Sequence, residues 1–311
     1  MTSNARIAFL TGVNSLEQTL EESWAVESTP RGAFVRRGLT VASFNLLETF
    51  ILERLDEIAK YLNSGNLMYT ELPTLMQLPS ARTAIEVASA KVRRLDDAAL
   101  NALSVALGEA LSSSQGTRLA FSALSWVWTG SNMSSDDYRA ALRKFHVADA
   151  FSKVRDVTSR IGFPAVNATS TSPLDLKSLL DELAKERHAS AHNSSHSVST
   201  MWLKTVGNTL IRFAAGFDIL VSVAASNLRE ANAEYIADDK WTNADKMIFH
   251  LIVEREKDFA YLRDFSGRAL KVEKDGDSLF GATTRNRKLN DVVVRVDKNR
   301  RIENWIIPSV G

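Results

Sequence analysis

Two long stretches of this sequence carry apolar residues at steps of three and four, the spacing that places side chains on one face of an α-helix. They span residues 33–62 and 198–235. The apolar positions are Phe44, Leu47, Phe50, Ile51, Leu55 and Ile58 in the first stretch, and Trp202, Val206, Leu210, Phe213, Phe217, Leu220 and Val223 in the second. A helix with such a stripe buries it against other elements. The chain is therefore predicted to be mainly α, a helical bundle that the second stretch closes.

Shorter helices are predicted around these two. A capping box at residues 14–17 predicts a helix to about residue 27, which Pro30 and Gly32 then interrupt. Further helical stretches follow Ser80, Asp96, Ser134 and Asp149.

The helical period is lost toward the C-terminus, where short strands are predicted instead. One hairpin is predicted from Ala269 to Phe280 around the tight turn Asp275-Gly276, and another pairs residues 292–296 with residues 302–307. The predicted organisation is an N-terminal helical extension (1–31), a helical domain (32–237) and a small β-rich C-terminal subdomain (238–311).

The composition is that of a globular protein, with 45% hydrophobic and 24% charged residues. Lys and Arg number 38 against 37 Asp and Glu, so no overall basic charge attracts nucleic acid and any RNA site must be local. The absence of cysteine excludes disulfides and thiol catalysis and fits a reducing compartment. No signal-peptide pattern is present, and no apolar run approaches the roughly 18 residues of a membrane helix. We therefore expect a cytoplasmic protein that makes no membrane contact.

Cations gather near the predicted turns of the C-terminal part. They are Arg285, Arg287, Lys288, Arg295, Lys298, Arg300 and Arg301. Either they form a solvated surface, or they supply the contacts to an RNA backbone that a neutral bundle lacks.

Candidate chemistry is concentrated between Asp181 and His196, a stretch that holds three of the five histidines of the chain. Arg187 directly precedes His188, and four residues separate it from His192. Imidazole gains and loses a proton near neutral pH, whereas guanidinium stays cationic and offers a fork of donors that fits a phosphate. A general acid/base next to a phosphate clamp is the minimum required for cleavage of RNA without a metal.

The orientation of these groups poses a difficulty. Ser172 and Pro173 predict the start of a helix whose apolar stripe is Leu176, Leu179, Leu180 and Leu183. At about 100° per residue, Arg187 falls close to the centre of that stripe, and His192 lies about 140° further round. Either the helix distorts near Ala189-Ser190, or Arg187 and His192 meet across the two-fold axis of a dimer.

The segment Arg187-His188-Ala189-Ser190-Ala191-His192 resembles the Arg-x4-His signature of the HEPN superfamily of all-helical ribonucleases, in which a polar residue commonly follows the arginine. The helix-rich layout is similar to that of the RiboL-PSP-type HEPN proteins associated with toxin and phage-defence systems. The resemblance covers roughly residues 32–234 and leaves the C-terminal part outside it. It implies an RNA substrate, a homodimer with one cleft built from two motifs, and an antitoxin or partner defence protein as regulator.

The expected reaction is attack of a ribose 2′-hydroxyl on its adjacent phosphate, with no metal and no cofactor. His192 would move the proton, Arg187 would stabilise the charge of the phosphorane, and His188 would orient the phosphate or act as a second acid/base. Glu48 is either a residue at the edge of the core or, in a HEPN protein, the carboxylate partner of Arg187, because a buried guanidinium favours a carboxylate.

Two other functions fit the same residues. His188, His192 and His196 are spaced to chelate a divalent ion, although the helix is predicted to end between Asn193 and Ser197, before His196 joins the other two. A catalytically silent HEPN module that only binds RNA or a protein partner is the second alternative. Cleavage of RNA in the presence of EDTA separates these functions.

Overall fold

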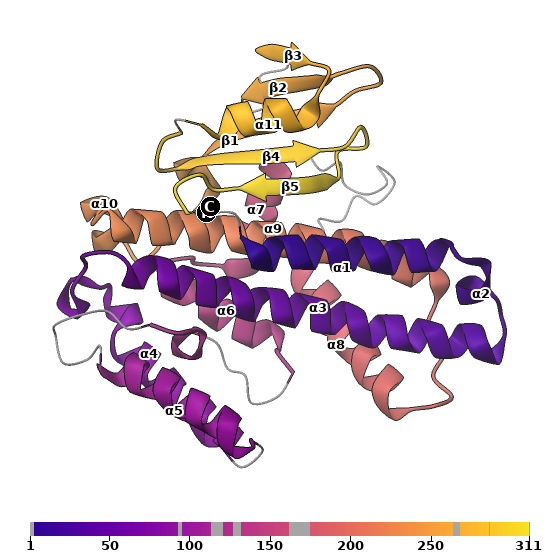
Figure 1. Ribbon diagram of the computed structural model, residues 1–311, viewed down its shortest axis with the longest axis horizontal. Helices are drawn as coiled ribbons and strands as arrows, with labels where there is room; N and C mark the ends of the chain where they lie inside the picture. Colours follow the sequence, from indigo (N-terminus) through magenta and orange to yellow (C-terminus); the bar gives the residue numbers. More distant parts are fainter. Residues whose placement is uncertain are drawn as a thin grey trace.

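The computed structural model describes residues 3–92, 95–112, 121–126, 132–161, 175–263, 268–285 and 287–310. Within these ranges the chain is mainly helical and carries a small C-terminal mixed sheet of five strands (Figure 1). The helices are α1 (Asn4–Glu21), α2 (Ser23–Val26), α3 (Pro30–Asn63), α4 (Leu78–Lys91), α5 (Asp97–Ser112), α6 (Ser135–Lys144), α7 (Ala150–Arg160), α8 (Leu176–His192), α9 (Thr200–Arg229), α10 (Ala233–Ala237) and α11 (Gly276–Thr284). The strands are β1 (Ile248–Glu254), β2 (Phe259–Arg263), β3 (Lys271–Glu273), β4 (Asp291–Val296) and β5 (Ile302–Ile306). Single 3-10 turns are η1 (Tyr69–Glu71), η2 (Thr74–Met76), η5 (Ala123–Ser125) and η6 (Ala244–Lys246).

The two longest helices, α3 and α9, pack against each other, as their periodicity predicted (Figure 1). α3 begins earlier than predicted, because the Thr29 hydroxyl accepts the Gly32 N–H at 3.1 Å and Pro30 occupies the first turn, where its missing N–H costs nothing. Pro30 and Gly32 therefore start a helix where an interruption was predicted.

Helix α9 forms the centre of the core. It is long and apolar enough to cross a membrane by composition, but 94% of its most apolar window is buried against the rest of the protein. A Cβ at Gly216 would lie 2.7 Å from a methyl group of Val154, so this glycine allows the close approach of α7. The apolar character of α9 thus serves packing within the protein.

Helix α1 is an integral part of this helical body. The predicted start at residues 14–17 is wrong, because the Ser3 hydroxyl accepts the Arg6 N–H at 3.1 Å and caps a helix that begins at Asn4. Phe9 and Val13 pack in the same core cluster as residues of α3, α9 and the sheet. One hydrophobic core therefore runs across the predicted segment boundaries at 31/32 and 237/238.

The sheet has the strand order β3-β2-β1-β4-β5, with β1 and β4 parallel and all other neighbours antiparallel. The hairpin predicted for residues 292–307 is confirmed as β4 and β5, with Val294 opposite Trp305. The hairpin predicted for residues 269–280 is wrong. The Asp275 side chain accepts the Asp277 N–H at 3.0 Å and caps α11, which packs against β1, β2 and β4. Residues such as Leu251 and Trp305 join the core of the helical body.

A buried ionic cluster joins the sheet to the helices. Asp218 of α9 is 0% exposed and accepts hydrogen bonds from Arg54 Nε at 2.6 Å, Ser222 at 2.7 Å and Trp305 Nε1 at 2.7 Å. Burial acts to raise the pKa of this carboxyl, but the attraction of Arg54 and Arg6 and the hydrogen bonds from Arg54 and Ser222 outweigh it and hold the pKa below its ordinary value. One carboxylate therefore accepts hydrogen bonds from three elements that are distant in sequence, α3, α9 and β5.

Candidate active site on helix α8

Helix α8 lies along α3, on the side of the body away from the sheet (Figure 1). Its N-terminus is capped by Asp175, whose carboxylate accepts the N–H groups of Lys177 at 3.1 Å and Ser178 at 3.3 Å. The predicted start at Ser172 and Pro173 falls outside the described residues. Leu176, Leu180 and Leu183 are buried, which confirms most of the predicted apolar stripe. That stripe sets the rotation of the helix, and with it the direction of every residue that follows.

The helix continues without a break from Leu176 to His192, where the Asn193 N–H bonds to the Ala189 carbonyl at 2.8 Å. A distortion near Ala189-Ser190 is therefore ruled out. Arg187 is half-buried, whereas His188 and His192 are exposed. Within one chain, the arginine and the histidines leave α8 on different sides.

Arg187 lies over an aromatic ring of α3. Its Cζ is 5.8 Å from the centre of the Phe44 ring, within the range of a cation–π contact. Its Nε is buried and has no hydrogen-bond partner among the described residues. A buried guanidinium N–H without an acceptor is costly, and a phosphate oxygen is an acceptor that such a group binds well.

Glu48, one helical turn beyond Phe44 on α3, is near enough to Arg187 to feel its charge. Burial raises the pKa of the Glu48 carboxyl above its ordinary value, and a hydrogen bond from the Met133 N–H and the attraction of Arg187 offset this only in part. No hydrogen bond joins Glu48 to Arg187 among the residues that the structure describes. Glu48 thus acts on Arg187 through space, while its carboxylate is bound to the backbone of Met133.

The two exposed histidines lie side by side on α8. The ring centres of His188 and His192 are 4.7 Å apart, at an angle of 50°. His196 does not extend this pair. The helix ends before it, as predicted, and His196 Nε2 lies 2.8 Å from a carboxylate oxygen of Glu186. A pair of imidazoles is therefore open to solvent at the end of α8, without the third histidine that a metal stripe would need.

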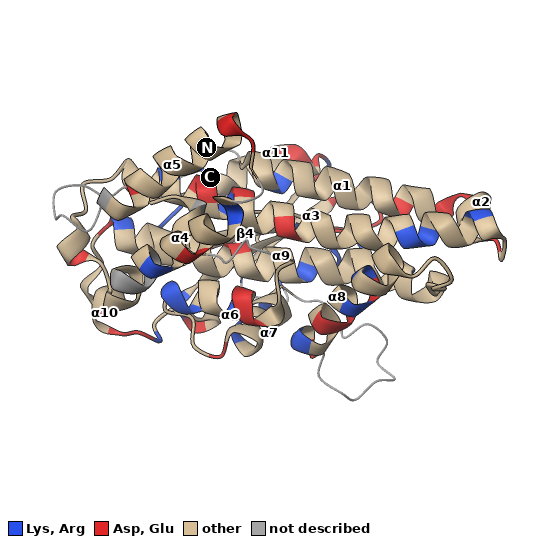
Figure 2. Cartoon of the chain, turned by 90° about the horizontal axis from the view of Figure 1, so that it is seen from below, with Lys and Arg blue, Asp and Glu red and all other residues tan. Residues whose placement is uncertain are grey.

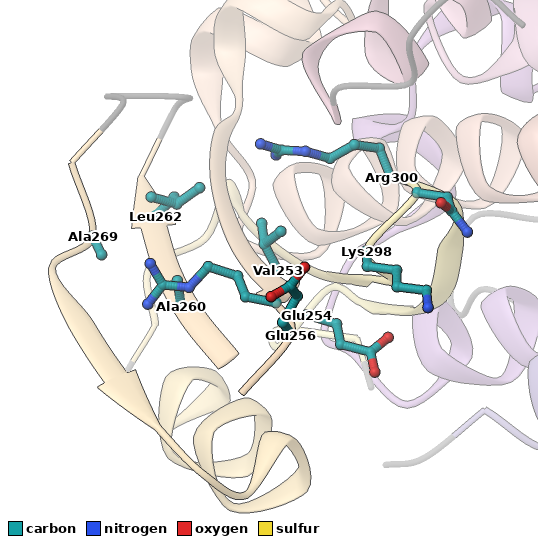
Figure 3. Close-up of a pocket in the computed structure, with 10 residues that line it drawn as sticks. Val253, Glu254, Glu256, Ala260, Leu262, Ala269, Lys298 and Arg300 are labelled. Atoms are coloured by element: carbon teal, nitrogen blue, oxygen red, sulfur yellow. The ribbon is translucent and has the colours of Figure 1, made fainter. Parts of the chain in front are cut away.

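The C-terminal sheet and α11 lie on the far side of the helical body from α8 (Figure 1). Arg295 pairs with Asp277 and Glu303, and Arg301 pairs with Glu17 at 2.6 Å, so these two are neutralised within the chain. Lys298 and Arg300 line a hollow of about 530 Å³ that Glu254 and Glu256 also line (Figure 3). On the helical side of the molecule, acidic and basic residues are scattered among uncharged ones (Figure 2). The predicted RNA-backbone surface is thus interrupted by carboxylates where the structure describes it.

Sequence reasoning missed the surroundings of α8 on α3. Phe34 and Gly38 of α3 and Ser190 of α8 line one groove. Phe34 and Gly38 are more than 150 residues from Ser190 in the sequence, and no spacing rule connects them. The only signal in the sequence was a glycine inside a predicted long helix; the exposure of Phe34 is seen only in the structure. No protein-family model, no curated protein and no solved structure matches the chain.

Proposed function

We propose that the protein is a metal-independent endoribonuclease of the HEPN type. The observation that carries this proposal is the buried Nε of Arg187, which has no hydrogen-bond partner in the described part of the chain, on the same helix as two solvent-exposed imidazoles. Arg187 would bind the scissile phosphate and stabilise the charge that develops on it. His192 would transfer the proton of the 2′-hydroxyl, and His188 would orient the phosphate or serve as the second acid/base.

The complete site would be shared between two copies of the chain. Because α8 is unbroken, Arg187 and His192 of one copy face different sides, and two α8 helices related by a two-fold axis would bring one arginine to the histidines of the other. The HEPN resemblance also favours a role in a toxin–antitoxin or anti-phage system. An antitoxin or partner defence protein would then control the activity.

The test is incubation of the purified protein with total RNA and with tRNA in EDTA. We expect cleavage in EDTA, products that carry 2′,3′-cyclic phosphate or its opened forms, and no cleavage of DNA, which lacks the attacking hydroxyl. Cleavage that EDTA abolishes and Mn²⁺ restores would replace this mechanism with a metal-dependent one. Binding of RNA with no cleavage under any condition would identify the catalytically silent module.

A further inference from the structure

A groove opens between α3 and α8. It is lined by Phe34, Arg37, Gly38 and Val41 of α3 and by Ser190 and Ala191 of α8, and its volume is about 340 Å³. This volume lies at the small end of the range of roughly 300–1,000 Å³ that ligand pockets occupy. The groove is therefore large enough for a small planar group.

Phe34 is the aromatic surface of this groove. Its side chain is 70% exposed, although it belongs to the longest helix of the described chain. An aromatic ring left in water offers its face to a partner, and proteins that bind single-stranded nucleic acid stack bases on such rings.

Gly38 keeps the groove open. It lies within α3, where glycine is less favourable than alanine because it gains backbone freedom in the unfolded chain. A Cβ at this position would meet nothing within 4 Å. Packing within the described chain therefore does not require a glycine here, whereas a larger side chain would project into the groove.

Ser190 supplies a polar group on the opposite wall. The residue is 9% exposed, and its hydroxyl is buried without a hydrogen-bond partner in the part of the chain that the structure describes. A hydroxyl both donates and accepts. It can therefore bond to the edge of a heterocycle whose face lies on Phe34.

The groove adjoins Arg187, the residue proposed to bind the phosphate. Ser190 is three residues from Arg187, close to one helical turn or about 5 Å along α8 and about 60° around it, whereas His188 and His192 lie about 160° away from Ser190. On α3, Val41 is three residues from Phe44, over which Arg187 lies. A group in the groove would thus be bound next to a phosphate held by Arg187.

We infer that the groove between α3 and α8 binds an unpaired nucleobase of the RNA, with its face on Phe34 and its edge on the Ser190 hydroxyl. This inference rests on the proposed function and adds its substrate class: single-stranded RNA, because a paired and stacked base has no free face or edge to offer. Phe34, Gly38 and Ser190 are then binding residues, and none of them takes part in the chemistry.

The experiment measures binding separately from cleavage. The probe is a fluorescein-labelled, single-stranded 2′-O-methyl oligonucleotide, which lacks the attacking hydroxyl, and the readout is fluorescence anisotropy. Gly38→Leu fills the groove, and Phe34→Ala removes its aromatic surface. The matched controls are Gly108→Leu, another helical glycine with nothing within 4 Å of its Cβ, and Met201→Ala, another exposed apolar side chain.

We expect Gly38→Leu and Phe34→Ala to weaken binding about five-fold or more, as loss of one base-stacking aromatic does, with thermal midpoints unchanged or raised. Both controls should bind like the wild type. Wild-type affinity in Gly38→Leu and Phe34→Ala, or no binding by the wild type, would overturn the inference. Loss of binding together with dissociation of a dimer, seen by light scattering, would assign the groove to a protein interface and overturn it as well. Binding that depends on the groove in a protein that cleaves no RNA would support the inference and refute the nuclease.

Discussion

At the scale of single residues, Arg187 occupies an unfavourable position for the stability of the chain. Its Nε is buried and lacks an acceptor in the described structure, which costs on the order of 1–3 kcal/mol. The sequence predicted that Arg187 would lie on the apolar side of α8, because the leucine spacing fixes the rotation of the helix. It could not predict that the guanidinium would lie over Phe44, since that contact depends on which helix packs against α8.

Arg187→Ala and His192→Ala are each expected to abolish RNA cleavage with little change in thermal midpoint. The reason is that, among the described residues, Arg187 has no hydrogen bond through Nε to lose, and His192 is exposed. His196→Ala, which removes only the contact with Glu186, should retain most of the activity. Cleavage assays and thermal denaturation of the same preparations check this. Full activity per folded molecule in Arg187→Ala would make the arginine a purely structural residue.

Glu48→Gln is expected to raise the thermal midpoint at pH 7, or to leave it unchanged. The pKa of Glu48 is raised in the folded protein, chiefly by burial, so the folded state binds the proton more tightly than the unfolded chain does. Ionised Glu48 therefore disfavours folding, and this effect is present above the unfolded pKa of about 4.3 and absent below it. Thermal denaturation of the wild type and Glu48→Gln between pH 3.5 and 7.5 tests whether ionised Glu48 lowers the stability of the folded state. A variant that is less stable at pH 7 than at pH 4, relative to the wild type, would show that the Met133 N–H and the charge of Arg187 together outweigh the burial of ionised Glu48.

Among elements, the apolar patterns predicted α3, α9 and the β4–β5 hairpin. α3 buries one stripe, whereas α9 is buried on all sides from Leu210 to Leu228 and β4 at nearly every position. The ends of elements were harder to predict. Asn14 and Glu17 match a capping box but lie inside α1, where Ser3 supplies the cap. Asp275-Gly276 matches a hairpin turn, yet Asp275 caps α11. In both places one short motif fits two local structures, and packing against the core decides between them.

The contribution of the N-terminal cap of α8, Asp175, to the stability of the protein can be measured. Asp175→Ala is expected to destabilise the protein by about 1 kcal/mol, because two N–H groups in the first turn lose their acceptor. Asp175→Asn keeps an oxygen that can accept these bonds and should lose much less. Urea denaturation of the two variants gives the comparison. Equal stability of the alanine and asparagine variants would mean that the cap contributes nothing.

At the scale of the whole molecule, the regular geometry of α8 means that the proposed function depends on whether two copies of the chain pair. The sequence showed that Arg187 and His192 are about 140° apart on a helix, and the unbroken α8 leaves a two-fold pairing as the way to bring them together. The surface that would pair is not encoded in any local pattern. It follows from how α3 and α8 lie together, which the sequence did not reveal.

Mixing Arg187→Ala protomers with His192→Ala protomers is expected to restore RNA cleavage. In a mixed dimer, one of the two composite sites keeps both an arginine and a histidine, so up to about half of the sites in mixed dimers are complete. Cleavage is measured after the subunits have been allowed to exchange, and each variant alone serves as the control. A wild-type protein that is monomeric by light scattering and still cleaves RNA in proportion to its concentration would exclude a shared site.

The contact between Trp305 and Asp218 also affects when the protein can complete its fold during synthesis. The two residues are 87 positions apart in the chain, so at roughly 5–20 residues per second the ribosome needs about 4–17 s to reach Trp305 after Asp218 has been made. Throughout that interval one oxygen of Asp218 lacks its indole donor, and the helical core around α9 is incomplete. A nascent chain that already contains Arg187 and His192 would therefore not hold them on a finished scaffold until β5 has been added.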